Sequence, residues 1–504
     1  MTTSTIRPVL VGADQVTDRQ DDLKRTQSPL DMMQTTAQGC AIDAGLSTAQ
    51  LTQIDTLAMV NSVGPQLVDN PPAALAKRLG MHHARQFLTV TGGNTPQMLV
   101  NHYAQKIAQG RSSMVLLTGA EALHSLSRFA KADTVVPWSD ENSQTQPTLF
   151  SPEKPGTNKT EHAHGMSAPI VTYPLFENAL RHHYRRTYAE HQGALGKLFA
   201  PFTTVAKNNP HAWFPTERSA TEISEPTKQN RYIGLPYTKY LNSIMQVNQS
   251  ASLLLTSDKK ARELGIDESK WVYLHGCADV NDIWNVSERI NFYDSPALRL
   301  GTAAAMAMAG IELDRINHFD LYSCFPAVVQ MACDAMGLST DDSRGLTVTG
   351  GLPYFGGAGN NYSMHAIATM MERLQQNPGD FGMVTANGWY VTKHALGIYS
   401  NTRPTSPFSY ADPSELNRQI DALKHPMMEE SPDGSATVET YTVMFDRDGQ
   451  PARGLILGSL ARGKRFVAYT RDDRDTLDQI VSQDPIGRSG RVSCGSKTNL
   501  FEFS

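Results

Sequence analysis

The chain has 504 residues, of which 40% are hydrophobic and 19% charged, and its formal net charge is −5. This length suffices for two to four domains, and the charge balance excludes general nucleic-acid binding, which needs a basic face. Because the chain has no apolar run near the ~20 residues of a membrane span, no signal-peptide pattern and five scattered cysteines without CxxC spacing, we expect a cytoplasmic protein without disulfides or a metal site.

The first expected helix has a counterpart later in the chain. Ser28, followed by Pro, opens an Ala- and Met-rich segment that ends at Gly45, and Ser295, also followed by Pro, opens a similar segment that ends at Gly310. Serine and proline favour a helix start, and glycine suits a helix end. An Asp stands ten residues after each glycine. Both segments therefore predict helices, and their order indicates an internal repeat.

The stretch "VTGGNTPQMLVNHYAQKIAQG", residues 90–110, predicts a buried strand, a glycine turn and a helix with Pro96 in its first turn. A strand is expected to follow at 113–121. Helix N-termini stabilise anions and thiolates. The apex of this turn nevertheless holds no Cys, Ser or Lys. The turn thus has the pattern of a nucleophile site from which the nucleophile is absent.

The second half repeats this arrangement. Gly350 and Gly351 form a second Gly-rich turn, a helix is expected from about 360 to 374, and a strand at 381–389. Each half therefore runs helix, strand, Gly-rich turn, helix, strand. Such alternation predicts mostly parallel sheets covered by helices. A pseudo-twofold axis relating the halves would bring the two Gly-rich turns together.

Two further regions differ in composition from the halves. Residues 124–245 are rich in Pro, His, Asn and Thr and predict a loop-dominated insertion with one or two helices. From about residue 410, apolar and polar residues alternate, with Asp448-Gly449 and Arg462-Gly463 at expected turns. This pattern predicts β-hairpins in a small separate domain.

Six segments form a recognisable set of motifs: "TGAEAL" (118–123), "NPHAWFPTE" (209–217), "NQSASLLLTSDKKARELG" (248–265), "FDLYSCF" (319–325), "GGLPYFGGAGNNYSMHA" (350–366) and "TANG" (385–388). With these motifs the chain resembles the thiolase superfamily, on the branch of sterol-carrier-protein-2-type and thiolase-like proteins, over about residues 5–402. The additional C-terminal segment is similar to that of the type 1 thiolase-like subgroup, whose members carry an extra domain.

The resemblance implies an α/β thiolase fold with two pseudo-symmetric βαβαβαββ halves in five layers, a loop domain and a small C-terminal β domain. On this interpretation, residues 1–123 and 246–268 form the N-terminal half, and 269–405 the C-terminal half. Residues 124–245 form the loop domain that binds coenzyme A, and 410–504 the additional β-rich domain.

The resemblance also places four altered positions at the site. The nucleophilic Cys falls on Gly93, the His of Gly-His-Pro on Gly357, and the second Cys on Ala386. The Asn-Glu pair falls on Tyr322 and Ser323. Thiolase chemistry needs a thiolate, a base that activates it and a second acid or base. We therefore expect no covalent acyl transfer at the usual position.

Other groups are candidates for the remaining chemistry. The resemblance implies that backbone N–H groups of Gly93 and Gly388 form an oxyanion site, which needs no side chain. Tyr322 is the first candidate for a catalytic side chain, because aldolase-like members of the superfamily use Tyr at this position. The further candidates are His394, His365, Tyr354, Tyr362 and Cys324. Each of them has an alternative interpretation as a packed structural residue.

Candidate ligand contacts lie in the turns and in the loop domain. Asn94, Asn360 and Asn361 are expected either to contact pantetheine or an acyl group, or to shape the turns. The stretch "RHHYRR" supplies Arg181, Arg185 and Arg186, which are expected either to grip CoA phosphates or to lie on a solvated helix face. His162 and His164 have no evident partner ligands, so we expect no metal, and no covalently bound cofactor.

These residues lead to three functional hypotheses. The first is an acyltransferase, or an enzyme that makes or breaks C–C bonds on CoA thioesters, without a covalent Cys intermediate. The second is a non-catalytic CoA- or acyl-CoA-binding protein. The third is a scaffold that binds a partner protein through the C-terminal domain. Thiolase subunits pair through a strand that corresponds to residues 86–91 here. The charged stretch "MHHARQ" before this strand would weaken such pairing, so both a monomer and a homodimer are considered.

Overall fold

The computed structural model describes residues 6–65, 67–138 and 145–504; the expected N-terminal segment 1–5 lies outside them. Its N-terminal half follows the order β α β α β α β β. The elements are β1 (Pro8–Thr17), α1 (Pro29–Asp43), β2 (Thr56–Met59), α2 (Pro71–Arg78), β3 (Arg85–Leu88), α3 (Thr95–Ala108), β4 (Met114–Ala122) and β7 (Asn248–Ser257), followed by the short α9 (Asp258–Glu263).

The C-terminal half repeats this order with one strand fewer among the described residues. Its elements are β8 (Val272–Asn281), α10 (Pro296–Ala309), β9 (His318–Asp320), α11 (Pro326–Met336), α12 (Tyr362–Gln376), β10 (Gly382–Gly388) and β11 (Lys393–Ser400). Turns and loops occupy residues 337–361 between α11 and α12. The expected repeat is therefore confirmed in the order of its helices and in its two Gly-rich turns.

The repeated helices start and end for the reasons expected. The Ser28 hydroxyl accepts a hydrogen bond from the Asp31 N–H, and the Asp31 carboxylate accepts one from the Ser28 N–H in return. Ser295 caps α10 in the same way through the N–H of Leu298. Gly310 ends α10 in the left-handed conformation, at φ +66°, which costs glycine little.

The strands form one nine-stranded sheet in the order β3-β2-β4-β7-β1-β8-β11-β10-β9. The two half-sheets meet where β1 pairs with β8, over Val9–Tyr273 and Leu10–Val272. The expectation of mostly parallel strands was wrong, because five of the eight neighbouring pairs are antiparallel. β7 and β11 each lie antiparallel to both neighbours, and this pattern is not visible in a simple alternation of helix and strand.

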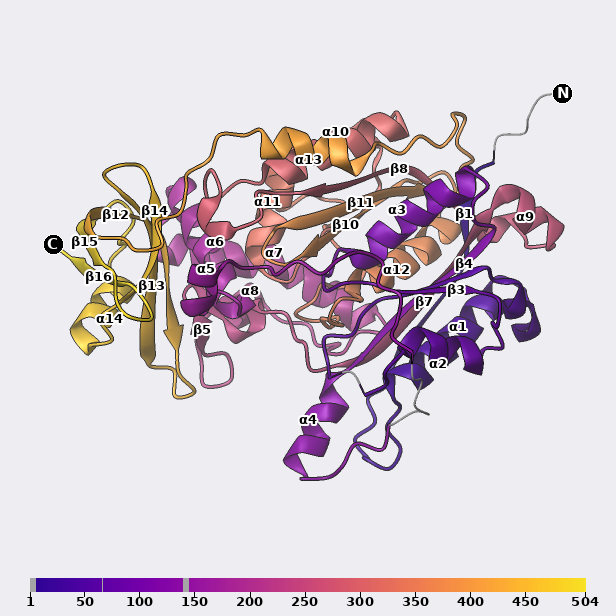
Figure 1. Cartoon of the computed structure of the whole chain (residues 1–504), viewed down its shortest axis with the longest axis horizontal. Helices are drawn as coiled ribbons and strands as arrows, with labels where there is room; N and C mark the ends of the chain where they lie inside the picture. Colours follow the sequence, from indigo (N-terminus) through magenta and orange to yellow (C-terminus); the bar gives the residue numbers. More distant parts are fainter. Residues whose placement is uncertain (1–5, 66, 139–144) are drawn as a thin grey trace.

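Helices complete a layered arrangement around the sheet (Figure 1). α3 and α12 lie against each other and contact strands of both half-sheets. α1 and α2 cover the outer face of the first half-sheet, and α10 covers that of the second. The N-termini of α3 and α12 follow the two Gly-rich turns, so the central layer brings the two turns together.

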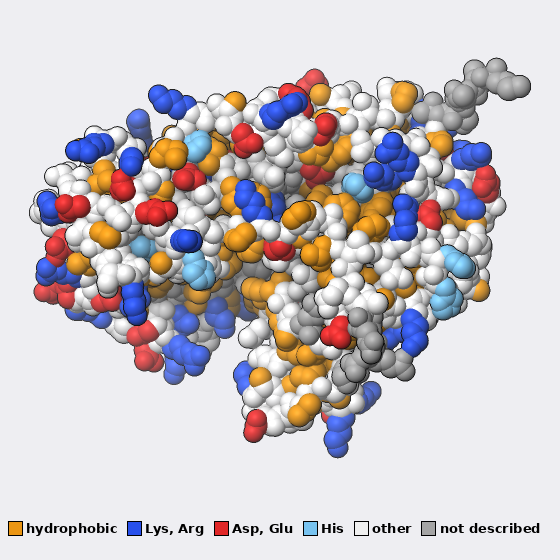
Figure 2. Space-filling model, viewed as in Figure 1, with side chains coloured by type: hydrophobic (Ala, Val, Ile, Leu, Met, Phe, Trp, Pro, Cys, Tyr) orange, Lys and Arg blue, Asp and Glu red, His pale blue; other side chains and the backbone are white. Residues whose placement is uncertain are grey.

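The segment between the halves contains more helix than expected. Its elements are α4 (Leu123–Lys131), α5 (Lys159–Ala163), α6 (Pro169–His183), α7 (Tyr188–Asn208), α8 (Ala220–Ser224), β5 (Tyr232–Gly234) and β6 (Tyr237–Thr238). α4 stands on a separate lobe at the bottom of the view in Figure 1. Hydrophobic side chains gather on this lobe in Figure 2.

The C-terminal region contains α13 (Pro413–Asp421), which packs on β8, and a small β structure. Five strands form a barrel, in which the last strand pairs with the first. In order of pairing they are β12 (Gly434–Phe445), β13 (Pro451–Leu460), β14 (Arg465–Thr470), β16 (Leu500–Phe503) and β15 (Ser489–Ser493). α14 (Arg474–Ser482) packs on it. The expected hairpin turns are confirmed at Gly449 and Gly463, both at φ +78°. β5 and β6 extend the barrel sheet from the loop segment.

The free edge of β3 is covered by the chain itself at Leu88, its last residue. The Leu88 N–H donates to the Thr148 carbonyl at 2.9 Å, and the Phe150 N–H donates to the Leu88 carbonyl at 2.8 Å. An occupied strand edge cannot pair with a second chain. We expect a monomer of 55.3 kDa in size-exclusion chromatography with light scattering. A stable species of twice this mass at micromolar concentration would show that pairing does not require this edge.

Candidate functional site

The two Gly-rich turns are joined by hydrogen bonds. The Gly92 N–H donates to Asn360 Oδ1 at 2.9 Å, and Asn360 Nδ2 donates to the Asn61 carbonyl at 2.7 Å. Ser363, in the first turn of α12, donates to the Gly93 carbonyl at 2.9 Å. The pseudo-symmetric halves therefore meet at the N-terminus of α3, as the repeat predicted. Asn360 therefore accepts a hydrogen bond from the first Gly-rich turn and donates one to the residue after β2 and Val60.

Tyr322 occupies the space in front of Gly93. A Cβ atom on Gly93 would lie 2.2 Å from Tyr322 Oη and 2.6 Å from the Asn387 carbonyl oxygen. Tyr322 follows β9 and is only 5% exposed, and its ring packs edge-on against Tyr362 with centroids 5.5 Å apart. Burial raises the pKa of Tyr322 well above its usual value. A neutral phenol, a hydrogen-bond donor, thus stands where a side chain at position 93 would be.

Asn387 and Tyr173 complete this cluster and were not among the predicted site residues. Asn387 Nδ2 donates to Tyr173 Oη at 2.8 Å and lies 3.9 Å from Cys324 Sγ. The Tyr173 ring stacks on Phe325 at 4.3 Å. Asn387 lies in "TANG", between two positions that the sequence did single out, whereas nothing in the sequence connects Tyr173 to the site.

Cys324 lies in the same cluster as Tyr322. It is buried, and burial raises the pKa of its thiol to about 12, against smaller opposing effects of hydrogen bonds from Tyr173 and Asn387. The group is therefore a thiol and not a thiolate at neutral pH. Since the thiolate is the nucleophile, Cys324 has no activated form in this environment.

The opposite side of the turn holds Asn94 and Lys393. A Cβ atom on Gly388 would lie 2.4 Å from Asn94 Oδ1 and 2.9 Å from Lys393 Cε. Asn94 is buried, and its Oδ1 has no hydrogen-bond partner among the described residues. Lys393 Nζ donates to the Thr91 carbonyl, and burial lowers its pKa to about 8. The sequence analysis did not single out Lys393, although it adjoins His394 in "TKH".

The two candidate histidines each have a partner outside the Tyr322 cluster. His365 stands two residues after Ser363 on α12, so the two side chains point about 200° apart around the helix. His365 Nδ1 lies 2.9 Å from Gln15 Oε1. His394, on β11, lies with Nε2 3.1 Å from the Val391 carbonyl. Burial lowers the pKa of His365 to about 3 and that of His394 to about 4. Both are neutral at pH 7.

The two further tyrosines have different surroundings. Tyr362 Oη lies 2.6 Å from Thr349 Oγ1 and donates to Asp320 Oδ1 at 3.0 Å, which fits a structural role. Tyr354 packs against Phe199 of α7, and its buried hydroxyl has no partner among the described residues. Asn361, at the start of α12, donates to the Gly119 carbonyl at 2.8 Å and so also ties the halves together.

The three candidate arginines gather beside a surface cavity of about 860 Å³ between α6 and the barrel. Arg181 is 3% exposed; it pairs with Asp484 at 2.7 Å and lies over the Tyr188 ring, so its charge is already compensated inside the protein. Arg185 is exposed and Arg186 half-buried. The cavity therefore presents Arg185 and Arg186, while Arg181 holds the loop segment to the C-terminal domain.

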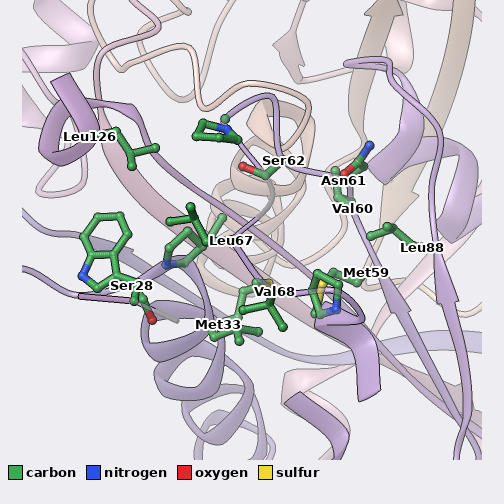
Figure 3. A pocket seen from close by; sticks show the side chains of 17 residues that line it. Ser28, Met33, Met59, Val60, Asn61, Ser62, Leu67, Val68, Leu88 and Leu126 are labelled. Atoms are coloured by element: carbon green, nitrogen blue, oxygen red, sulfur yellow. The ribbon is translucent and has the colours of Figure 1, made fainter. Parts of the chain in front are cut away.

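A smaller apolar cavity of about 70 Å³ lies beside Asn61, the residue whose carbonyl accepts from Asn360 (Figure 3). The side chains that line it are mostly apolar and come from α1, β2, the loop after β2, β3 and α4; they include Met33, Met59, Val60, Leu67, Val68, Leu88 and Leu126. Ser62 supplies a polar edge. An apolar hollow of this kind favours a short aliphatic group.

A buried carboxyl, Glu121, holds the loop at this cavity. Ser62 Oγ donates to it at 2.9 Å, and the Val63 N–H donates as well. Burial raises the pKa of Glu121 to about 7 from 4.5. A raised carboxyl pKa means that the native state keeps a proton that the unfolded state releases. Its stabilisation is complete below pH 4.5 and is lost as pH rises through about 7.

We expect Glu121→Gln to remove this pH dependence. Wild type should lose about 3 kcal/mol of stability from this group between acidic and alkaline pH. Thermal melting from pH 5 to pH 8.5 should therefore show a smaller drop in Tm for the variant than for wild type. Glu225→Gln, at an exposed loop position, is the control and should behave as wild type. Equal drops in all three proteins would exclude Glu121 as the source.

Among the described residues, no group of three or more His, Cys, Asp or Glu side chains is placed to hold a metal ion. None of the helices in the described chain is both long and apolar enough to cross a bilayer.

Comparison with known proteins identifies the family. Residues 415–497 match the family model for the thiolase-like protein type 1 additional C-terminal domain. The crystal structure of a monomeric SCP2-thiolase-like protein type 1 from Mycobacterium smegmatis is 37% identical to this chain, covers 99% of both chains and superposes with a TM-score of 0.86. The chain belongs to the SCP2-thiolase-like protein type 1 family.

Other solved structures have the same fold as this chain although their sequence identity to it is low. The peroxisomal thiolase of Saccharomyces cerevisiae is 14% identical and covers 79% of this chain and 98% of its own, with a TM-score of 0.55. An Ltp2–ChsH2(DUF35) aldolase is 18% identical, with the same two coverages and a TM-score of 0.57. The search of curated protein sequences gave no match. These structures confirm the expected thiolase fold with an additional C-terminal domain.

Proposed function

We propose that this SCP2-thiolase-like protein type 1 binds CoA thioesters and polarises their carbonyl group without forming an acyl-cysteine intermediate. The observation that supports this most is the position of Tyr322 Oη, 2.2 Å from where a Cβ of residue 93 would lie. A hydroxyl at the N-terminus of α3 replaces a nucleophilic side chain. The thioester would therefore meet a hydrogen-bond donor at this point.

The chemistry of a neutral phenol fits this role. Because burial raises the pKa of Tyr322, the hydroxyl keeps its proton and donates to a carbonyl oxygen or to an enolate oxygen. Backbone N–H groups of Gly93 and Gly388 would donate to the same oxygen. Donors that are fixed before the reaction stabilise developing negative charge. This serves direct acyl transfer and also the making or breaking of a C–C bond next to the thioester.

The remainder of the ligand would extend in two directions. Arg185 and Arg186, beside the 860 Å³ cavity, would bind the phosphates of CoA, because guanidinium groups pair with phosphate through two hydrogen bonds. A short acyl chain would enter the apolar cavity beside Asn61. Asn94 would contribute a polar contact near the thioester.

A second function, CoA binding without catalysis, is favoured by one observation. The ring nitrogens of His365 and His394 lie against Gln15 Oε1 and the Val391 carbonyl, and the Cys324 thiol has a pKa of about 12. Tyr322 thus has no ionisable base among these candidates to complete a proton relay. A protein with this site would hold the thioester and release it unchanged.

Calorimetry and a thiol-release assay distinguish the two functions. Binding of CoA together with release of free CoA from acetyl-CoA or longer acyl-CoAs would support polarisation chemistry. Binding without release would support the binding function, and the absence of both would contradict the proposal. Arg185→Ala combined with Arg186→Ala should weaken CoA binding about tenfold or more. Lys228→Ala, at an exposed loop position, is the control for loss of surface charge.

A further inference from the structure

A third cavity, of about 400 Å³, lies at the N-terminus of α3, where Asn94 lines it and Tyr322 does not. Its walls come from α3, β8, β11, the start of α13 and the segment 150–154. Lys154 and Trp284 lie at its edge, with the Lys154 ammonium 3.9 Å from the Trp284 ring centre. Polar and charged side chains from five segments thus converge on one space, which shares Asn94 with the proposed thioester site.

Lys393 is the amine of this cavity. It is 8% exposed and lies at the start of β11, where its Nζ donates to the Thr91 carbonyl. The Trp389 ring lies 5.7 Å from the ammonium. Burial lowers the pKa of Lys393 to about 8, and the nearby Glu153 opposes this only partly. Lowering the pKa increases the share of the neutral, nucleophilic amine near neutral pH.

Asp279 supplies a carboxyl on the same face of the sheet. Lys393 pairs with Asn281 across β8 and β11, and Asp279 stands two residues before Asn281, so the two side chains are diagonal neighbours. Diagonal pairs are separated by about 7–8 Å. Asp279 Oδ2 accepts from Tyr410 and from Asn101. Both side chains line the 400 Å³ cavity.

Two acceptor oxygens in this cavity have no partner among the described residues. They are Oδ1 of Asp279, which is 9% exposed, and Oδ1 of Asn94, which is 6% exposed. Burial also raises the pKa of Asp279 to about 7. Buried polar atoms rarely stay unpaired, so a ligand with hydrogen-bond donors is the simplest complement. A carboxyl of this pKa both gives and accepts a proton near neutrality.

We propose that this cavity is a reactive site in which Lys393 forms an imine with a small, polar aldehyde or ketone. Lys393 Nζ attacks the carbonyl carbon, and the new C–N bond forms as the carbonyl oxygen takes up a proton. The resulting carbinolamine then loses water to give the imine. Asp279 donates the proton to the departing hydroxyl and receives the one that leaves the nitrogen. No oxidant or reductant is needed, and the amine and the carboxyl of this site take no part in the proposed thioester site.

Limited labelling with acetaldehyde and cyanoborohydride tests this proposal on the intact protein. The reagent reduces an imine to a stable ethylamine, and peptide mapping locates it. Lys393 should be ethylated at least tenfold faster than Lys154, which is exposed at the rim. Lys228, at an exposed loop position, serves as a second accessible reference. Label spread over exposed lysines, with Lys393 no faster than Lys154, would overturn the proposal.

Two variants separate the amine from its environment. Lys393→Arg should lose the fast label, whereas Lys154→Arg should retain it. Asp279→Asn should slow labelling of Lys393 about tenfold and leave labelling of Lys228 unchanged. Unchanged labelling of Lys393 in Asp279→Asn would overturn the role of the carboxyl. The wild-type comparison of Lys393 with Lys154 needs no variant, so a folding defect cannot hide the result.

Discussion

A Tyr322→Phe variant is expected to release CoA from acyl-CoA about 10²–10³-fold more slowly than wild type while it binds CoA with nearly unchanged affinity. The variant removes only the hydroxyl, and losing one preorganised donor to a developing oxyanion costs about this much in rate. Binding depends on contacts elsewhere on CoA and should persist. A thiol-release assay at saturating acyl-CoA, with calorimetry for affinity, measures both effects.

The matched control is Tyr441→Phe in the barrel. Tyr441 is fully buried on β12, and its hydroxyl has no partner among the described residues. The Tyr441→Phe variant therefore removes the same atom from a similar environment outside the Gly93 cluster. Its rate of CoA release should equal that of wild type. A Tyr322→Phe protein that is as fast as wild type would show that the hydroxyl at Gly93 takes no part in the reaction.

A Gly93→Ala variant is expected to be less stable than wild type by about 3 kcal/mol, at the upper end for an overpacked core. The added Cβ would meet Tyr322 Oη at 2.2 Å and the backbone oxygen of Asn387 at 2.6 Å. The backbone oxygen cannot rotate away. Thermal melting should show a clear fall in Tm. Gly193→Ala is the control, because a Cβ there meets nothing within 4 Å and alanine favours a helix interior.

A double-mutant cycle assigns this cost to Tyr322. In a Tyr322→Ala background, the added Cβ on Gly93 meets only the Asn387 oxygen as a close contact, so the further loss of stability from Gly93→Ala should be smaller by more than about 1 kcal/mol. The same loss in both backgrounds would mean that Tyr322 does not fill the space in front of Gly93.

Local signals in the sequence account well for the elements around the site. Ser28 and Ser295 cap the helices that they were expected to cap, and Gly310 ends α10 in the left-handed conformation. The repeated Gly-rich turns do meet, through Asn360. Capping, glycine turns and internal repeats depend on residues close in sequence or on order alone, and these are visible without a structure.

Contacts between distant segments could not be predicted in this way. The direction of Tyr322 toward Gly93 depends on how β9 and α3 are placed across the central layer, and the hydrogen bond from Asn387 to Tyr173 joins the second half to the loop segment. Lys393 becomes unusual only because its neighbours exclude water. The pairing of β5 with the barrel joins segments about 200 residues apart in the sequence.

The mass of the intact protein after incubation with acetyl-CoA, before and after hydroxylamine treatment, tests most directly the claim that no cysteine carries an acyl group. Hydroxylamine cleaves a thioester and leaves an amide in place. The position of Tyr322 and the protonated thiol of Cys324 predict no hydroxylamine-labile acetyl adduct on any of the five cysteines. A labile adduct of one acetyl group that maps to Cys324 would contradict this claim.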